Sequence, residues 1–345
     1  MGRPDDALEV PELPEVEVVR AGLQPAVTGA TIAAVAVFDD RSLRRHPGPA
    51  EDFVQRLTGR EILAAVRRGK FLWMPLDALF GTDPSGPEAL VAHLGMSGQV
   101  LLRDRATDDP RTRIRIDLEH PLRGPLRLNF VDQRIFGSMA IDALVPTADG
   151  RAGGFSGGSG GLVGKGGVVG PSGAVAGGAV AGVAGGEAPW PAPLVPSRVA
   201  HIARDPLDPA FSDARFYAAL SKRRTGVKRA LLDQTLVSGI GNIYADEALW
   251  AARLHFAQPT DTLSRTRARA LLGEVRLVLG KAVAEGGTSF DAQYVNVNGA
   301  SGYFSHSLNA YGQHGRDCPR CGRPITREAF MNRNSHFCAF CQRLR

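Results

Sequence analysis

The four cysteines are the sequence feature that most constrains how this chain can fold. All of them lie in two Cys-x-x-Cys pairs near one end of the sequence. A disulfide framework would scatter cysteines along the chain, whereas two such pairs close together are typical of a zinc site. Two local disulfides in a secreted protein are the alternative. We expect one structural zinc, because four thiolates leave no coordination position open for a substrate. The expected ligands are Cys318, Cys321, Cys338 and Cys341.

A glycine-rich segment at residues 148–196 divides the rest of the chain. It has almost no large side chains and buries too little apolar surface to offset its ordering entropy, so it predicts a flexible linker. A membrane span is the alternative, but glycine dominates and Lys165 interrupts the segment. The expected regions are an extension at 1–10, a β-rich catalytic domain at 11–147, the linker at 148–196, a helical domain at 197–312 and a zinc finger at 313–345.

The region before the linker alternates short apolar runs with turn signals, which is typical of half-buried antiparallel strands. These runs are 30–38, 61–66, 90–93, 114–118 and 126–130, and apolar spacing predicts a helix at 15–23. After the linker, apolar spacings of three and four predict helices at 213–221, 227–236, 242–251 and 263–285. The fold class is therefore α+β, with an N-terminal β-sandwich or barrel with flanking helices, a helical domain and a zinc-finger hairpin.

The charge balance favours an acidic partner. The chain has 41 Lys and Arg against 35 Asp and Glu, which gives a net charge of +6. Nucleic acid is the commonest partner of such a protein, although many basic proteins do not bind it. The N-terminus is acidic and lacks the apolar stretch of a signal peptide. We therefore expect a cytoplasmic protein with reduced cysteines.

A helical hinge at residues 227–250 strengthens the case for phosphate binding. Residues 238–242, Ser-Gly-Ile-Gly-Asn, separate two predicted helices. Glycines allow close approach of a ligand to backbone amides, and the second helix would offer its N-terminus to a phosphate. Packing of two helices without DNA is the alternative. Five cations lie nearby and favour the phosphate site: Lys222, Arg223, Arg224, Lys228 and Arg229.

The N-terminal motif carries a family resemblance. Residues 11–17, Pro-Glu-Leu-Pro-Glu-Val-Glu, predict a helix start with Pro14 at its first position and acids in its first turn. This motif, with Arg-Gly-Lys-Phe-Leu at 68–72, His-Leu-Gly-Met-Ser-Gly at 93–98 and Asp-Gln-Arg-Ile-Phe-Gly at 132–137, resembles the bacterial formamidopyrimidine-DNA glycosylases (MutM) of the Fpg/Nei family. The hinge resembles that family's helix–two-turns–helix, and the cysteine module resembles its zinc finger.

The resemblance implies a bifunctional DNA glycosylase and AP lyase of base excision repair. It would excise 8-oxoguanine and formamidopyrimidines from double-stranded DNA as a monomer and nick the strand by β,δ-elimination, associating with the nucleoid during repair. The implied catalytic residues are Pro11 as nucleophile, Glu12 as acid/base, Glu15 as a supporting carboxylate, and Lys70 and Arg333 in the eliminations. A terminal amine suits the first role because its pKa lies near 8, against about 10.4 for lysine.

The resemblance also implies a set of DNA contacts. Met96, Arg134 and Phe136 would fill the space left by an extruded base, although core packing is the alternative for Met96 and Phe136. Residues 286–304 align with the loop that covers that base. The implied DNA-contacting residues are completed by His93, Arg113 in place of a family histidine, Arg223, Lys228 and Asn242.

One departure from the family bears on the chemistry. Ten residues precede Pro11, and the nitrogen of an internal proline is a tertiary amide without a proton, which cannot form a Schiff base. Our hypothesis is that translation starts at Val10, since GTG encodes valine and also initiates, and that loss of the initiator frees Pro11. If residues 1–10 are retained, a non-catalytic, lesion-sensing homologue becomes the alternative.

Two further alternatives have sequence signatures of their own. An endonuclease VIII-like glycosylase would prefer oxidised pyrimidines, and Leu13 within its motif favours the purine branch. A zinc-dependent transcription factor would also be basic and carry a finger. It would not need the N-terminal carboxylates or Lys70.

Overall fold

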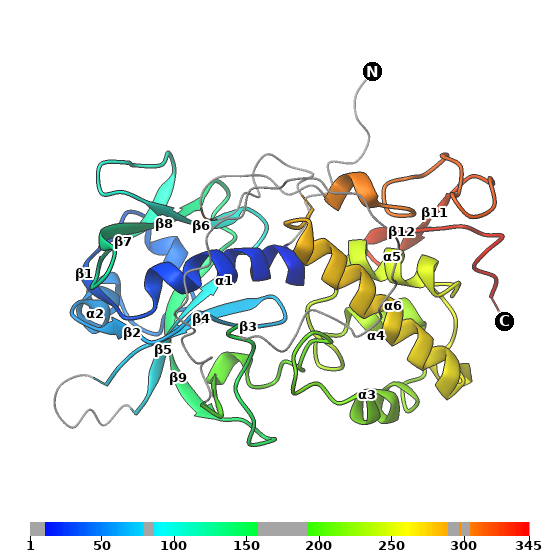
Figure 1. Ribbon diagram of the computed structural model, residues 1–345, viewed down its shortest axis with the longest axis horizontal. Helices are drawn as coiled ribbons and strands as arrows, with labels where there is room; N and C mark the ends of the chain where they lie inside the picture. The colour runs from blue at the N-terminus through cyan, green and yellow to red at the C-terminus, as the bar shows by residue number, and fades with distance from the viewer. Residues whose placement is uncertain (1–10, 79–85, 158–191, 289–296, 298–303, 345) are drawn as a thin grey trace, which may run out of the picture.

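The computed structural model describes residues 11–78, 86–157, 192–288, 297 and 304–344. Figure 1 shows two groups of elements, mainly strands on one side and mainly helices on the other, with helix α1 (Leu13–Val27) running from one to the other. This is the α+β class that the sequence predicts. The two groups have separate hydrophobic cores, and α1 contributes to both: Leu13 to the helical core, and Val16 and Leu23 to the core of the sheets.

The N-terminal group contains two five-stranded antiparallel sheets. The first has the order β2 (Glu61–Ile62), β1 (Ala30–Val37), β7 (Thr112–His120), β8 (Gly124–Asp132) and β6 (Gly98–Arg103). The second has the order β10 (Leu194–Pro196), β9 (Ser138–Pro146), β5 (Glu88–His93), β4 (Phe71–Pro75) and β3 (Val66–Arg68). The expected single strand at 61–66 is wrong, because Ile62 pairs with β1 whereas Val66 pairs with β4 in the other sheet.

Alternating side chains make the core of this domain. Ile114, Ile116 and Leu118 of β7 are fully buried while the two residues between them are partly exposed, as expected for a sheet with one face against the core. Leu72 and Leu90 of the second sheet belong to the same cluster. The short helix α2 (Ala50–Leu57) and the 3-10 turn η1 (Asp40–Leu43) complete the domain.

The helical domain has four α-helices among the described residues, α3 (Asp213–Leu220), α4 (Val227–Leu232), α5 (Asn242–Ala251) and α6 (Arg265–Ala284). The 3-10 turn η2 (Ser197–Val199) precedes α3, η3 (Thr260–Thr262) lies between α5 and α6, and η4 (Phe304–Ser307) follows α6. Helix α4 ends at Leu232 and not at 236 as expected. The carboxylate of Asp233 accepts hydrogen bonds from the backbone and hydroxyl of Thr235 at 2.9 and 2.6 Å, which favours a turn over continued helix.

Both ends of the segment expected to be a linker belong to the folded N-terminal domain. Gly153 N donates to Ala192 O at 3.1 Å, and β10 extends the second sheet by pairing with β9. Phe155 lies under the guanidinium groups of Arg20 and Arg67, at 5.2 and 5.7 Å. Residues 158–191 and the extension at 1–10 lie outside the described residues.

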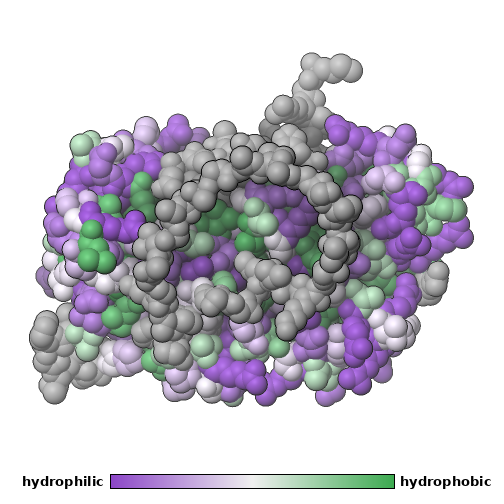
Figure 2. Space-filling model, viewed as in Figure 1, coloured by the Kyte–Doolittle hydropathy of each residue, from purple (hydrophilic) through white to green (hydrophobic). Residues whose placement is uncertain are grey.

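The C-terminal hairpin consists of β11 (Thr326–Phe330) and β12 (Arg333–Phe337) and packs on α5. On the face drawn in Figure 2, hydrophilic side chains are frequent over the hairpin and helical domain. Among the described helices, none combines the length and apolar character needed to cross a membrane.

Candidate active site and DNA interface

The start of α1 is fixed at the junction between the two cores. Leu13 N donates to Gly239 O at 2.9 Å, and the Leu13 side chain is fully buried. The helix begins at Leu13 with Glu12 as its N-cap, so Pro14 occupies the second helical position and not the first. The Glu15 carboxylate accepts from Glu12 N at 2.9 Å. The backbone next to buried Pro11 is therefore held by both domains.

The carboxylate of Glu12 lies at the N-terminus of α5. Its two oxygens accept from Gly241 N at 2.6 Å and Ile243 N at 3.1 Å. A Cβ on Gly241 would overlap this carboxylate, so glycine is required there for close approach. The sequence assigns this helix terminus to a phosphate. That expectation is wrong for these two amides, because the side chain of Glu12 already binds them.

Burial makes Glu12 a weak acid. It raises the pKa of the Glu12 carboxyl to about 8, against the opposing effects of the Lys70 charge and the two backbone amides. Burial also lowers the pKa of the Lys70 ammonium, and the nearby carboxylates oppose that shift. A carboxyl with a pKa near 8 holds its proton at neutral pH and can donate it during a reaction.

Lys70 is placed by a tight turn between β3 and β4. Gly69 in this turn has φ +56, and an added Cβ would lie 2.6 Å from the side chain of Ser238 in the hinge. The turn therefore abuts the hinge directly. Lys70 and Glu12, which are far apart in sequence, interact electrostatically in the folded chain.

Glu15 connects three segments. Its Oε1 accepts from Tyr244 Oη at 2.7 Å, from Thr288 N at 2.8 Å and from Thr288 Oγ1 at 2.9 Å. Sequence reasoning missed Tyr244 and Thr288, because a tyrosine within a helix and a threonine after glycines have no distinctive pattern. Thr288 lies within the predicted base-covering loop, 286–304, of which residues 289–296 and 298–303 lie outside the described residues.

Two turns next to each other carry the predicted void-filling side chains. Met96 lies in the turn between β5 and β6, and Arg134 and Phe136 lie in the turn between β8 and β9. Arg134 is exposed, and Phe136 is 43% exposed. Phe136 therefore does not pack in the core. Met96 is partly buried.

His93 and Arg113 flank these turns. His93 ends β5, and burial lowers its pKa to about 4, with the charges of Arg45 and Arg44 acting in the same direction. The imidazole is therefore neutral at physiological pH and would meet a phosphate as a hydrogen-bond donor. Arg113 donates from Nε to Asp132 O at 2.8 Å. Its guanidinium thus supports the turn that carries Arg134.

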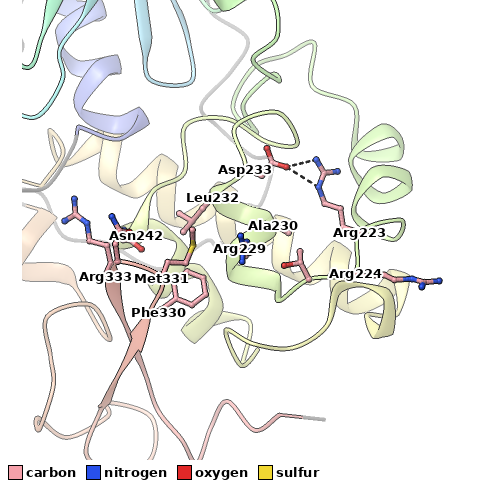
Figure 3. A pocket seen from close by; sticks show the side chains of 12 residues that line it. Arg223, Arg224, Arg229, Ala230, Leu232, Asp233, Asn242, Phe330, Met331 and Arg333 are labelled. Atoms are coloured by element: carbon pink, nitrogen blue, oxygen red, sulfur yellow. Dashed lines mark hydrogen bonds and ion pairs between the residues drawn. The ribbon is translucent and has the colours of Figure 1, made fainter.

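A groove of about 460 Å³ lies between the hinge and the hairpin. Figure 3 shows Arg333 of β12 and Asn242 of α5 side by side at one end, whereas Arg224 points away. Arg223 also lines the groove and pairs with Asp233 at 2.7 Å. The structure thus brings Arg333, Asn242 and Arg223 to one cavity, although they lie far apart in sequence.

Lys228 lies in the interior and not at the DNA-contacting surface that the resemblance implies. It is fully buried, with Nζ 2.7 Å from Asp246 Oδ1 and 2.8 Å from Ser335 Oγ. A side chain held in this way does not present its ammonium to a phosphate on the surface. In this structure Lys228 instead joins α4 to α5 and to the hairpin.

The four cysteines form one cluster, as predicted. Their sulfur atoms all lie within 4.8 Å of one another. Four thiolates around one tetrahedral zinc lie about 3.8 Å apart, given Zn–S bonds near 2.3 Å, so the cluster fits this ion. Trp250 Nε1 donates to Cys318 Sγ at 3.4 Å, which anchors the cluster to α5. The site is closed and structural, and it fixes the hairpin that carries Arg333.

Comparisons with known proteins agree with this arrangement. Three family models match the chain: the formamidopyrimidine-DNA glycosylase N-terminal domain at residues 10–139, its H2TH domain at 202–293, and the zinc finger found in FPG and IleRS at 317–344. Formamidopyrimidine-DNA glycosylase from Leifsonia xyli is 58% identical over 336 residues, covering 97% of this chain and 100% of that protein. The Thermobifida fusca protein of the same name is 48% identical, covering 96% and 97%.

Solved structures extend the likeness to proteins bound to DNA. MutM (Fpg) from Thermus thermophilus has a TM-score of 0.68 at 32% identity, covering 97% of this chain and 99% of that one. Lactococcus lactis Fpg in complex with abasic-site DNA has a TM-score of 0.68 at 25% identity, covering 96% and 99%. With its fold, its closed cysteine cluster and matched family models along most of its length, the chain belongs to the formamidopyrimidine-DNA glycosylase family.

Proposed function

We propose that this chain excises oxidised purines such as 8-oxoguanine and formamidopyrimidines from double-stranded DNA, and then nicks the strand by β,δ-elimination. The observation that carries the proposal is the buried Glu12 carboxyl, next to Pro11 in the chain, with its two oxygens held by the amides of Gly241 and Ile243. It provides a proton donor next to a nucleophile in a protein of this family. Association with the nucleoid during repair follows from this substrate.

The chemistry assigns a task to each of these two residues. The nitrogen of Pro11 forms a bond to C1′ of the damaged nucleotide, and the bond from C1′ to the base breaks. The base leaves with the electron pair of that bond and takes up a proton, which balances the proton that the secondary amine loses. A Schiff base at C1′ also requires the sugar ring to open, and the departing ring oxygen needs a proton. Glu12, protonated at neutral pH, supplies that proton.

The two elimination steps use the cationic side chains of Lys70 and Arg333. The electron-poor C1′ of the Schiff base acidifies a C2′ proton, whose loss expels the 3′ phosphate and forms a C2′–C3′ double bond. This bond is conjugated with the Schiff base and acidifies the C4′ proton, whose loss expels the 5′ phosphate. Lys70 lies near Glu12 and assists at the sugar, and Arg333 in the groove holds a departing phosphate. His93, Arg223 and Asn242 contact phosphates, and Met96, Arg134 and Phe136 occupy the space of the extruded base.

The nucleophile requires a secondary amine at Pro11. We therefore propose that the catalytic form begins at Pro11, where the nitrogen carries a lone pair and is no longer an amide. The match to the N-terminal family model starts at residue 10, next to this proline, and supports the proposal. A chain that retains residues 1–10 would bind lesions without cleaving them.

Incision of defined duplexes tests the proposal. Wild type, here the chain that begins at Pro11, is incubated with duplexes containing 8-oxoguanine opposite cytosine or an oxidised pyrimidine opposite adenine, beside Glu12→Gln in the same chain. We expect rapid incision of the 8-oxoguanine duplex, slow incision of the pyrimidine duplex and loss of activity in the variant. Preference for the pyrimidine duplex would favour the endonuclease VIII-like alternative, and binding without incision would favour a lesion sensor.

A further inference from the structure

The turn that carries Arg134 and Phe136 is held from two sides. On one side, the buried carboxylate of Asp132 accepts from three backbone amides of the turn, Arg134 N at 3.0 Å, Ile135 N at 3.0 Å and Gly137 N at 2.7 Å. These bonds orient the amides inward and leave the carbonyl groups of the turn facing outward. Asp132 lies within the sequence motif of the turn itself.

On the other side, Arg44 binds those carbonyl groups. Its Nη1 donates to Ile135 O at 2.8 Å and to Gly137 O at 2.9 Å, and its Nη2 donates to Phe136 O. Arg44 follows the 3-10 turn η1 and lies far from residues 135–137 in sequence. A planar guanidinium, whose donors have fixed directions on separate nitrogen atoms, suits these three carbonyls, whereas the donors of an ammonium all extend from one nitrogen atom.

The backbone of the turn is strained at Ile135. Ile135 has φ +58, a left-handed conformation that is rare for a β-branched residue and persists only when its surroundings impose it. Arg44 and Asp132 bond the backbone on both sides of Ile135. These bonds provide the external constraint.

The same turn is also tied to the Met96 turn. Ser97 Oγ donates to Asp132 Oδ1 at 2.5 Å, and a Cβ on Gly95 would overlap the backbone of Phe136 and Gly137. Fixing one turn therefore fixes the other. The three side chains proposed to enter the DNA are carried by one preorganised unit.

We propose that Arg44 is a positioning residue for base extrusion, which holds the Arg134–Phe136 turn in the shape that enters the duplex. The inference rests on the proposed function of these side chains. Arg44 acts through the turn and not on the reacting atoms. Its loss should slow extrusion of a paired base more than cleavage at a site where no base remains.

Substitution of Arg44 by lysine and by glutamine separates this role from simple phosphate attraction. Arg44→Lys keeps the charge but replaces the two nitrogen atoms that donate to the turn by one, whereas Arg44→Gln removes the charge. Arg41→Gln is the matched control, since Arg41 lies in η1, has a side chain that is 74% exposed, and bonds Asp39 rather than the turn. Each variant is assayed on an 8-oxoguanine duplex and on a duplex with a preformed abasic site.

We expect both Arg44 variants to slow 8-oxoguanine excision by roughly tenfold or more, because small displacements of positioned groups have effects of this size. Abasic-site cleavage and the Arg41 control should stay near wild type. The fluorescence of 2-aminopurine next to the lesion should report reduced unstacking in both Arg44 variants. Wild-type behaviour of Arg44→Lys would overturn the inference, as would an equal loss on both substrates.

Different measurements test the proposed function and the role of Arg44. If wild type does not incise the 8-oxoguanine duplex, the proposed function is wrong. The 2-aminopurine signal on binding still compares wild type with the Arg44 variants in that case. An unstacking signal that is equal in all of them would overturn the role of Arg44.

Discussion

Gly241 shows how one missing side chain can shape an active site. Its hydrogen atom faces the Glu12 carboxylate, and the amides of Gly241 and Ile243 bind both carboxylate oxygens. The sequence indicates a close approach at this glycine, but it does not reveal the ligand. Glu12 lies more than two hundred residues away, so only the fold identifies it.

Gly241→Ala tests this contact. The added Cβ would displace the Glu12 carboxyl, and we expect the excision rate to fall by roughly 100-fold, as for misplaced catalytic groups elsewhere. Gly273→Ala is the matched control, because Gly273 is in α6 and a Cβ there meets nothing within 4 Å. The control should excise normally and gain about 0.5–1 kcal/mol of stability. Equal activity of the two variants would argue against the role of Glu12.

His93 predicts a specific dependence of stability on pH. Its pKa in the folded chain is about 4, below its ordinary value of 6.5. Between these values the unfolded chain binds more protons, so the free energy of unfolding falls as pH falls from 6.5 to 4, by at most about 1.4 kcal/mol per pH unit. Above pH 6.5 the effect is absent.

Denaturant unfolding of His93→Asn across this window checks the prediction. In His93→Asn, the free energy of unfolding should lose the part of its pH dependence that His93 contributes between pH 4 and 6.5. His201→Asn, which changes an exposed histidine, should keep that pH dependence. A slope unchanged in His93→Asn would mean that His93 is not kept neutral by its surroundings.

At the scale of elements, the contact between α5 and the hairpin depends on a buried ion pair. Lys228 of α4 and Asp246 of α5 are 2.7 Å apart and both are almost fully buried. Asp246 also accepts from His336 N of β12 at 2.8 Å. The pair therefore connects the hinge to the element that carries Arg333.

Asp246→Asn should destabilise the chain by about 3–5 kcal/mol, because it leaves the Lys228 ammonium buried without its counter-charge. Adding Lys228→Met to this variant should recover part of the loss. Asp261→Asn, at an exposed acid, should change stability by no more than about 0.5 kcal/mol. Chemical denaturation measures all three, and a small effect of Asp246→Asn would show that water reaches the pair.

The elements themselves were largely predictable from sequence. Helix α5 spans the predicted residues, and β7 and β8 contain the predicted runs, because amphipathic periodicity depends on local residues. Long-range pairing was not predictable. The run at 61–66 divides between two sheets, and Lys228, assigned to a phosphate by resemblance, meets Asp246 and Ser335 instead. Burial of a charge depends on partners that a one-dimensional pattern does not reveal.

At the scale of the whole molecule, the two domains meet around Glu12 and Lys70, and the described ends of the glycine-rich segment lie on the second sheet, where Phe155 pairs with Arg67 of β3 and β10 pairs with β9. Gly153 and Ala192, near its two ends, are already hydrogen-bonded to each other. The ends therefore do not depend on the length of chain between them. Loop length also changes closure free energy only slowly, by about 0.6 kcal/mol for each doubling.

Replacement of residues 158–191 by a short Gly-Ser loop should consequently leave excision of 8-oxoguanine within about twofold of wild type, with a melting temperature that is unchanged or slightly higher. A matched variant that also carries Phe155→Ala should be less stable, because it removes the ring beneath Arg20 and Arg67. A large loss of excision on replacement of the loop alone would give the segment a function in DNA repair.

The central claim is that the amine of Pro11 attacks the damaged nucleotide. Borohydride trapping on a duplex with 8-oxoguanine opposite cytosine tests it most directly, with the chain from Met1 compared with the chain from Pro11. The account predicts a covalent protein–DNA adduct only for the chain that begins at Pro11, with the peptide containing Pro11 carrying the added mass. An adduct on another residue, or none although both chains bind the duplex, would contradict it.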